Sequence, residues 1–208
     1  MYVSMKEMLA AANAGGSAVM AINCFNLETA RAVITTAAEE RAPIIVNIFE
    51  QHLLEHCDSE LICPVVKTLA NRVDVNVALN YDHGSDEKYL IKALDDGFSS
   101  VMADMSRYDL EENIRRTKNI ADYAHSLGAS VEGEIGCLGA SEDGKFTSDA
   151  MYTDPDQAKM FYERTGIDAL AISFGTSHGN YPEGMVPEFD IERLKKIKQL
   201  TGAPLVLH

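Results

Sequence analysis

Short apolar stretches alternate with longer segments of helical periodicity along the whole chain. The stretches predicted to be strands are residues 18–23, 43–48, 75–81, 99–103, 130–136, 168–174 and 204–208. They are apolar throughout rather than alternately polar, which is typical of parallel strands covered on both faces. The segments predicted to be helices are residues 27–40, 59–71, 85–97, 109–128, 154–166 and 191–200.

Capping residues support several of these helix boundaries. Asn26 precedes a segment with apolar residues at helical spacing, and Asp154 precedes Pro155, which is favoured at the first helical position. Gly97 and Gly166 follow the predicted last turns of two helices, where a left-handed glycine commonly ends the helix.

Seven strands separated by helices predict a parallel α/β sheet. The pattern alone allows either a TIM (β/α)8 barrel or an open doubly wound sheet, so the choice depends on the site residues. An eight-stranded barrel needs one more strand, and typical barrels run to about 250 residues. If the fold is a barrel, we expect residues 1–208 to form a single, C-terminally incomplete domain, which is either a truncated or interrupted barrel or part of a longer native chain. Without strand eight, its first and seventh strands would have unpaired edges.

Composition and charge narrow the class of protein. The chain has 208 residues with 46% hydrophobic content and a net charge of −14, and this charge argues against a nucleic-acid partner. No apolar run is long enough to span a membrane, and residues 1–7 lack the apolar stretch of a signal peptide. The four cysteines show no Cys-x-x-Cys spacing, so we expect a cytoplasmic protein with reduced thiols.

Three histidines follow predicted strands and are candidate metal ligands. They are His83 in Tyr81-Asp82-His83-Gly84, His178 before Gly179, and His208 after the last strand. Three imidazoles with an open fourth position form a common catalytic zinc site, and barrel enzymes build their sites at the carboxyl ends of strands. By itself, Asp82-His83-Gly84-Ser85 is also compatible with a simple strand-to-helix turn. The glycine-rich loop around His178 is common in proteins, and His208 alone carries little information.

Carboxylates form a second set of candidates. Glu132 and Glu134 lie two residues apart, so they share one face of the predicted strand, and Asp104 ends another strand. A helix-facing or surface position is the alternative for these acids. We interpret His52 and His56 as part of a solvated polar face, although their spacing resembles a helical metal pair.

Four segments together resemble the class II, zinc-dependent ketose-bisphosphate aldolases, most closely the tagatose-bisphosphate aldolase branch. The segments are residues 77–84, the acidic and glycine-rich 131–142, 154–179 with its Gly175-Thr176-Ser177-His178-Gly179 motif, and 204–208. The resemblance implies a TIM barrel and reversible aldol cleavage of a ketose 1,6-bisphosphate, tagatose or fructose, to dihydroxyacetone phosphate and glyceraldehyde 3-phosphate.

The resemblance also implies a role for each site residue. His83, His178 and His208 would hold the catalytic Zn²⁺, and Asp82 would exchange a proton with the aldehyde oxygen. Glu142 matches an acid involved in proton transfer at the nucleophilic carbon, and Gly179 would contact the phosphate of dihydroxyacetone phosphate.

Asp104 and Glu134 match positions that hold a second or displaced metal in related aldolases, and a monovalent cation is a further candidate there. A homodimer or homotetramer that acts on a small phosphorylated sugar, with no nucleic-acid or membrane partner, is the expected assembly.

The chain departs from the family pattern at four places. Asn80 stands where the family usually has His, and Phe49 stands near a usual small hydroxyl residue. The glycine-rich segment after His208 and the eighth-strand region are absent from the sequence. One alternative is therefore a non-catalytic, aldolase-like subunit that acts as a partner protein, and another is a barrel hydrolase that uses zinc-bound water.

Overall fold

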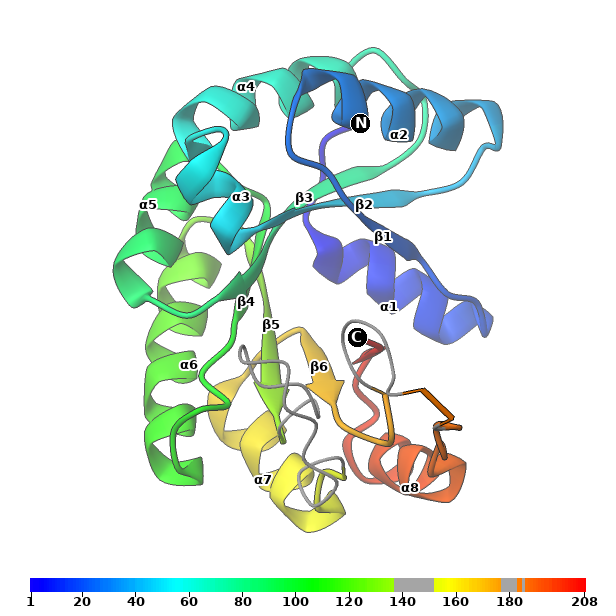
Figure 1. Ribbon diagram of the computed structural model, residues 1–208, viewed down its shortest axis with the longest axis vertical. Coiled ribbons are helices and arrows are strands. Elements are labelled where there is room, and N and C mark those ends of the chain that lie inside the picture. The colour runs from blue at the N-terminus through cyan, green and yellow to red at the C-terminus, as the bar shows by residue number, and fades with distance from the viewer. Residues whose placement is uncertain (137–151, 177–182, 185) are drawn as a thin grey trace. The chain divides into compact units, whose positions relative to one another are not determined.

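The computed structural model describes residues 1–136, 152–176, 183–184 and 186–208. Within these residues helices and strands alternate in chain order (Figure 1). The helices are α1 (Met5–Gly15), α2 (Leu27–Glu39), α3 (Glu50–Glu55), α4 (Ser59–Ala70), α5 (Glu87–Asp96), α6 (Leu110–Ser126), α7 (Pro155–Thr165) and α8 (Ile191–Thr201). The strands are β1 (Met20–Asn23), β2 (Ile44–Phe49), β3 (Val77–Gly84), β4 (Ser100–Ala103), β5 (Ser130–Ile135), β6 (Ala169–Ile172) and β7 (Leu205–Val206).

The strand order identifies the fold class. The seven strands follow one another in the sheet in the order of the chain, from β1 to β7. A doubly wound sheet would reverse its strand order at a switch point, whereas a TIM-type fold adds each strand beside the preceding one. The prediction of a TIM-type α/β fold is therefore confirmed, with β1 and β7 as the terminal strands of this order.

Two helices were not predicted, and among the strand ends that of β3 differs most from its prediction. Helix α1 begins after Ser4, whose side chain accepts a hydrogen bond from the Lys6 amide, and ends at the left-handed Gly16. Helix α3 is a short helix directly after β2. Strand β3 continues through Gly84, three residues beyond the predicted end. Short or amphipathic helices without a strong apolar stripe leave a weak signal in the sequence.

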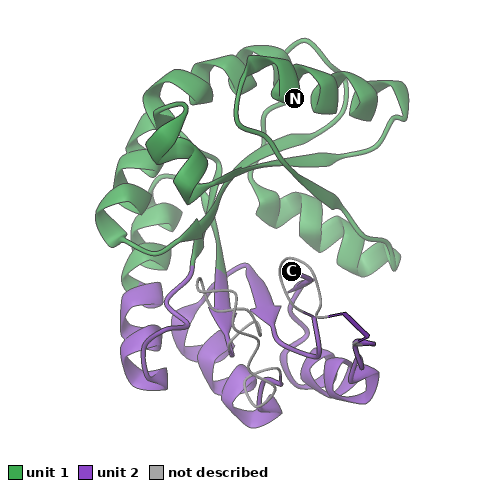
Figure 2. Ribbon diagram, viewed as in Figure 1, with its two compact units in different colours: residues 1–103, 119–132 green, residues 104–118, 133–208 purple. Residues whose placement is uncertain are grey.

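The described residues divide into two units (Figure 2). Unit 1 comprises residues 1–103 and 119–132, and unit 2 comprises residues 104–118 and 133–208. No helix in the described part of the chain is both long and apolar enough to cross a membrane.

In unit 1, helix α1 packs on one face of β2 and β3. Met5 and Met8 of α1 cluster with Ile45 and Ala78, which are partners in the β2–β3 ladder. Side chains alternate along a strand, so Asn47 and Phe49 share the face of Ile45, and Asn80 shares the face of Ala78. The face that α1 covers near the start of these strands is thus the same face that carries polar residues further along.

A row of polar residues crosses unit 1 at the middle of this face. The ladder pairs Asn23 with Asn47, Asn47 with Asn80, and Asn80 with Ser100. The Asn80 side chain donates to Asn47 Oδ1 at 3.1 Å and accepts from Ser100 Oγ at 2.9 Å. Asn80 is only 1% exposed, and these two hydrogen bonds satisfy its side-chain amide inside the core. Each such bond contributes about 1 kcal/mol to the stability of the fold.

In unit 2, close contacts connect β5 and β6 with their helices. A Cβ at Gly133 would lie 3.0–3.1 Å from Ile167, Phe161 and Thr117, so this face of β5 packs tightly against α6 and the α7 region. Thr153 Oγ1 donates to the Ile135 carbonyl and accepts from the Ser173 amide, which joins the ends of β5 and β6.

Candidate active site

Asp82 and His83 lie at the carboxyl end of β3 in unit 1. A carboxylate oxygen of Asp82 and an imidazole nitrogen of His83 lie within 4.8 Å of each other. Asp82 is buried and His83 is half-buried. Consecutive residues of a regular strand point to opposite faces, so this proximity requires a departure from regular strand geometry.

The backbone supplies that departure. His83 has a φ of 52°, one of two positive values among the described non-glycine residues, and the β3–β4 pairing shifts register between Tyr81 and Gly84. A left-handed conformation costs a non-glycine residue roughly 1–2 kcal/mol, and such conformations concentrate at functional sites.

Gly84 is required by close packing beside this distortion. A Cβ at Gly84 would lie 2.2 Å from Leu90 Cδ2 of α5 and 3.0 Å from the Met102 carbonyl oxygen. No side chain fits there, so α5 and β4 press directly against the backbone that follows His83.

An aromatic and imidazole cluster surrounds the ends of β1 and β2. Phe49 packs edge-on against His83, with ring centroids 6.1 Å apart, and against His52 at 5.7 Å. His52 also contacts Phe25 and His56, at 5.5 Å and 5.8 Å. The interpretation of His52 and His56 as a solvated polar face fits the exposed His56, whereas His52 is half-buried and its Nδ1 is enclosed.

Asp104 and Glu134 form a second close pair, within unit 2. Their carboxylate oxygens lie within 4.8 Å of each other. Asp104 follows β4, and its Oδ1 accepts hydrogen bonds from the Ser106 amide at 3.2 Å and the Ser106 hydroxyl at 2.7 Å. These two bonds fix the orientation of the half-buried Asp104 side chain.

Glu134 lies in β5 and is 2% exposed. The neighbouring Gly133 faces α6 and α7, so Glu134 points away from those helices by strand alternation. Asn113 of α6 donates to the Glu134 carbonyl at 2.9 Å and accepts from Thr117, which holds this part of β5 in place. The helix-facing alternative for Glu134 is thus wrong.

The other predicted site residues lie at the end of unit 2 or outside the described residues. His208 follows β7 and is half-buried. Glu142, His178 and Gly179 lie outside the described residues. Gly175, just before them, has a φ of 111°, and a Cβ there would lie 2.0 Å from the Glu188 carbonyl oxygen, so only glycine fits.

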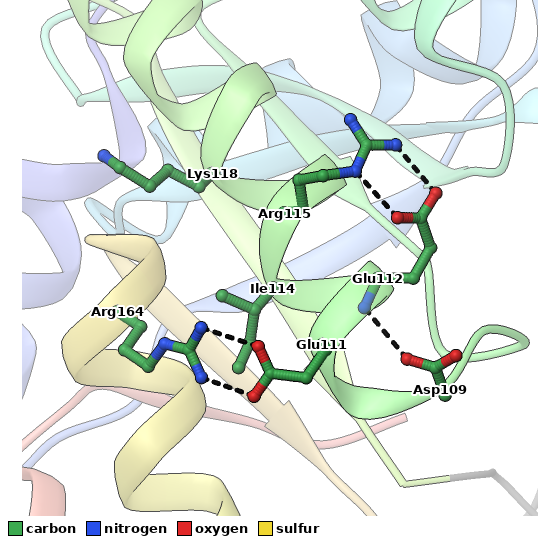
Figure 3. Close-up of a pocket in the computed structure, with 7 residues that line it drawn as sticks. All are labelled: Asp109, Glu111, Glu112, Ile114, Arg115, Lys118 and Arg164. Carbon is green, nitrogen blue, oxygen red and sulfur yellow. Dashed lines mark hydrogen bonds and ion pairs between the residues drawn. The ribbon is translucent and has the colours of Figure 1, made fainter.

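A charged surface pocket lies on unit 2 (Figure 3). It has a volume of about 630 Å³ and is lined by α6, the preceding Asp109, and Arg164 of α7. Arg164 makes two bonds to Glu111, at 2.6 Å and 2.7 Å. None of the described site residues lines the pocket, and its paired charges are typical of a solvated helix surface.

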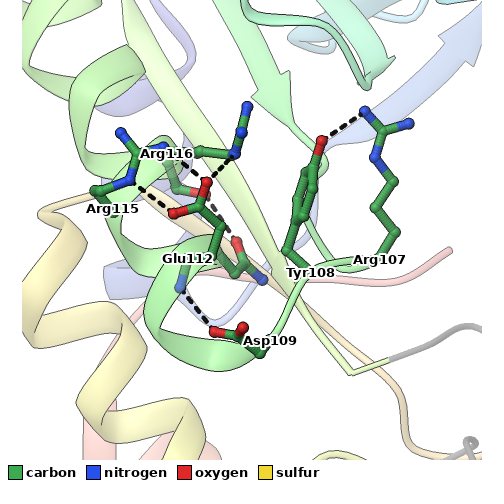
Figure 4. A network of polar contacts seen from close by, with 8 residues as sticks. Arg107, Tyr108, Asp109, Glu112, Arg115 and Arg116 are labelled. Atoms are coloured by element: carbon green, nitrogen blue, oxygen red, sulfur yellow. Dashed lines mark hydrogen bonds and ion pairs between the residues drawn. The ribbon is translucent and has the colours of Figure 1, made fainter.

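The start of α6 carries a polar network beside this pocket (Figure 4). Asp109 caps the helix by accepting from the Glu112 amide, and Glu112 binds both Arg115 and Arg116. Tyr108 packs under the Arg116 guanidinium, 4.4 Å from the ring centroid. These contacts stabilise the helix start and involve none of the candidate ligands that the structure describes.

The donor types of the described site residues fit a metal ion. His83 and His208 supply imidazole nitrogens, and Asp82, Asp104 and Glu134 supply carboxylate oxygens. Zn²⁺ accepts both kinds of donor, and the two carboxylates of unit 2 suit a harder cation as well. Two carboxylates within 4.8 Å repel each other, and a cation relieves that repulsion.

Comparison with known proteins identifies the family. The family model for class II fructose-bisphosphate aldolase matches residues 3–208. The chain belongs to the class II fructose-bisphosphate aldolase family. The resemblance to the class II aldolases seen in the sequence is confirmed, and so is the expectation of an aldolase, a carbon–carbon lyase of carbohydrate metabolism. The family is metal-dependent, in agreement with the donor types above.

Class II aldolases from bacteria and a fungus are similar to this chain. The fructose-bisphosphate aldolases of Geobacillus stearothermophilus and Thermus caldophilus are each 40% identical, over 99% and 100% of this chain and 72% and 68% of their own lengths. The crystal structure of the YdjI aldolase from Escherichia coli K12 aligns with a TM-score of 0.87 at 32% identity, over 100% of this chain and 73% of that one. A putative fructose-1,6-bisphosphate aldolase from Coccidioides immitis gives 0.85 at 33% identity, over 97% and 71%.

Proposed function

We propose that this chain catalyses reversible, zinc-dependent aldol cleavage of a ketose 1,6-bisphosphate, with tagatose slightly favoured over fructose as the sugar. The products are dihydroxyacetone phosphate and glyceraldehyde 3-phosphate. The observation that carries the proposal is the Asp82–His83 pair, where a carboxylate and an imidazole lie within 4.8 Å on a distorted strand end. Family membership supports the reaction class.

His83, His178 and His208 would hold the zinc ion. When bound, zinc would supply Lewis-acid stabilisation of the negative charge that develops on the three-carbon fragment. Asp104 and Glu134 would hold a second metal or a monovalent cation, because their carboxylates lie close together in unit 2. This chemistry needs no lysine Schiff base.

Asp82 would act as the acid/base at the C4 hydroxyl. In cleavage, the Asp82 carboxylate accepts the C4 hydroxyl proton as the C3–C4 bond breaks and C4 becomes the aldehyde carbon. The electron pair of the broken bond remains on C3, and Glu142 returns a proton there to give dihydroxyacetone phosphate. Burial of Asp82 favours this role, because low solvent exposure places the carboxylate in a desolvated site.

Backbone amides would hold the phosphate. Gly179 would contact the phosphate of dihydroxyacetone phosphate, since glycine lets the backbone approach an anion closely. The nearby Gly175 has the positive φ expected of such a loop start.

The proposal includes three wider properties. We propose that residues 1–208 belong to one barrel domain, and that the protein forms a homodimer or homotetramer with a cytoplasmic location. The thiols of Cys24, Cys57 and Cys63 are free.

The direct test is cleavage of tagatose and fructose 1,6-bisphosphate by this polypeptide, coupled to detection of triose phosphate. Turnover that a chelator abolishes and added Zn²⁺ restores is the expected result, and the ratio of the two rates ranks the sugars. A folded, zinc-loaded protein that cleaves neither sugar would instead favour a non-catalytic partner subunit.

A further inference from the structure

The segment from Tyr81 to Ser85 is held by one carboxylate from the neighbouring strand end. Glu50, the first residue of α3, accepts hydrogen bonds from the Ser85 amide at 2.9 Å and from the Tyr81 hydroxyl at 3.1 Å, both at Oε2. Its other oxygen, Oε1, accepts from the Ser85 hydroxyl at 2.6 Å. Both oxygens of Glu50 are thus bound to the residues that flank Asp82, His83 and Gly84.

The β2–β3 register explains why Glu50 lies there. Phe49, the last residue of β2, pairs with Asp82. Glu50 is the next residue, so it enters α3 directly beside the segment that follows Asp82. Its position is therefore set by the sheet, and it does not depend on a long flexible connection.

Glu50 binds β3 where the pairing between β3 and β4 is irregular. The β3–β4 ladder pairs Tyr81 with Val101 and Gly84 with Ala103, with the irregularity between these two pairs. Asp82 and the left-handed His83 lie in that interval. On the β2 side of β3, Glu50 binds Tyr81, which directly precedes Asp82, and Ser85, which directly follows Gly84.

We propose that Glu50 is a positioning residue that holds Asp82 and His83 in the geometry needed for metal binding and proton transfer. This role rests on the proposed function, in which His83 is a zinc ligand and Asp82 is the acid/base. Glu50 acts through Tyr81 and Ser85 and does not touch the reacting atoms. Residues that orient a metal ligand in this way commonly affect metal affinity or activity by about 10–100-fold.

The experiment compares Glu50→Gln with Glu55→Gln in the full chain. Glutamine keeps the shape of Glu50 but replaces one acceptor oxygen by a donor amide. Glu55 lies on the same helix and is exposed, with Gln51 as its hydrogen-bond partner, so it controls for loss of one negative charge on α3. The readouts are hydrogen exchange of amides 82–85 in the metal-free protein, zinc affinity by chelator competition, and kcat and KM.

In Glu50→Gln we expect the amides of residues 82–85 to exchange at least about tenfold faster than in Glu55→Gln. Zinc affinity and kcat should each fall by about 10–100-fold, with KM within about twofold. Tyr81→Phe should weaken zinc binding by a smaller factor alone and have no further effect in the Glu50→Gln background, because it acts through the same carboxylate.

Zinc affinity and exchange rates in Glu50→Gln within about twofold of the Glu55→Gln values would overturn the positioning role. If Glu50→Gln does not fold, Tyr81→Phe carries the same comparison, and an unchanged zinc affinity there overturns the role. Failure of the unmodified chain to bind zinc and cleave substrate overturns the proposed function and this role with it. The two failures are distinguishable because only the second appears in the unmodified protein.

Discussion

The Asp82–His83 pair in unit 1 and the Asp104–Glu134 pair in unit 2 bring candidate ligand atoms close together by different means. In each pair a ligand atom of one residue lies within 4.8 Å of a ligand atom of the other. Asp82 and His83 are adjacent in the chain and need a left-handed backbone and a register shift to approach each other. Asp104 and Glu134 come from the end of β4 and from β5, where chain folding brings them together without a positive φ at either residue.

Two residues that are adjacent in the sequence do not necessarily have side chains that lie close together in a site. Neighbouring strand residues diverge unless the backbone is distorted, and the distortion must be held by surrounding contacts. Residues far apart in the chain can meet on regular backbone when both lie at the carboxyl side of parallel strands. The first pair is therefore sensitive to changes in its supporting contacts, and the second is sensitive mainly to its own charges.

The largest effect is expected for His83→Ala. Loss of an imidazole ligand should remove zinc and lower kcat/KM by at least about 10³-fold. Metal content and cleavage of both sugar bisphosphates are the measurements. His125→Ala, at the end of α6, is the matched control and should leave both unchanged. Retained zinc and activity in His83→Ala would remove His83 from the site.

Asp82→Asn tests the other member of the same pair. The amide is isosteric with the carboxylate but cannot accept the proton, so kcat should fall by about 10²–10⁴-fold while zinc content stays near that of the unmodified chain. The rate and the metal content are measured on the same preparation. An unchanged kcat would exclude Asp82 as the acid/base, and a parallel loss of zinc would make it a ligand instead.

Asp104→Asn tests the charge dependence of the second pair. Asparagine keeps the Oδ1 acceptor for Ser106 and removes one of two neighbouring negative charges. In the presence of chelator the variant should unfold at a temperature about 2–4 °C higher, because like-charge repulsion is relieved, and added metal should stabilise it less than the unmodified chain. Thermal unfolding with and without metal provides the measurement. A lower unfolding temperature in chelator would contradict the repulsion between the two carboxylates.

The smallest effect is expected for Glu112→Gln on the charged surface of unit 2 (Figure 4). Hydrogen bonds from Arg115 and, next, from Arg116 lower the pKa of the Glu112 carboxyl to about 2. A carboxyl whose pKa is lower in the folded state than in the unfolded state contributes stability at pH values above its unfolded-state pKa. For Glu112 this contribution is lost as pH falls through about 2. Because the ion pairs are exposed, the unfolding temperature should change by no more than about 2 °C near neutral pH, and that difference should shrink as pH falls through about 2.

Activity provides the second readout for Glu112→Gln. It should remain within about twofold of the unmodified chain, because the pocket that Glu112 lines contains none of the described site residues. A large loss of activity would connect the α6 surface to the active site and remove the distinction between them.

The fold could be predicted in most respects from local patterns. Continuous apolar runs marked the strands, and capping residues such as Asn26 and Asp154 marked helix starts that the structure confirms. Helix α3 was missed because it has six residues and no side-chain cap. The end of β3 was predicted three residues early because Asp82-His83-Gly84 reads as a turn, whereas pairing with β2 extends the strand.

The site could be predicted less completely. The departure at Asn80 was visible in the sequence, but its place in a buried polar row with Asn47 and Ser100 depends on the register of three strands. The contacts of Glu50 could not be predicted from the sequence, because a glutamate after a strand is common and its partners Tyr81 and Ser85 lie 31 and 35 residues away.

The sequence by itself determined the α/β class, the family and the chemical identity of the candidate ligands, because periodicity, capping and motif residues are local properties of the chain. The tertiary structure alone decided the strand order, the left-handed turn at His83, the contact of Glu50 with Tyr81 and Ser85, and the proximity of Asp104 to Glu134. These features depend on sheet register and on packing between distant segments. Such interactions arise only when the chain is folded, and no local pattern encodes them.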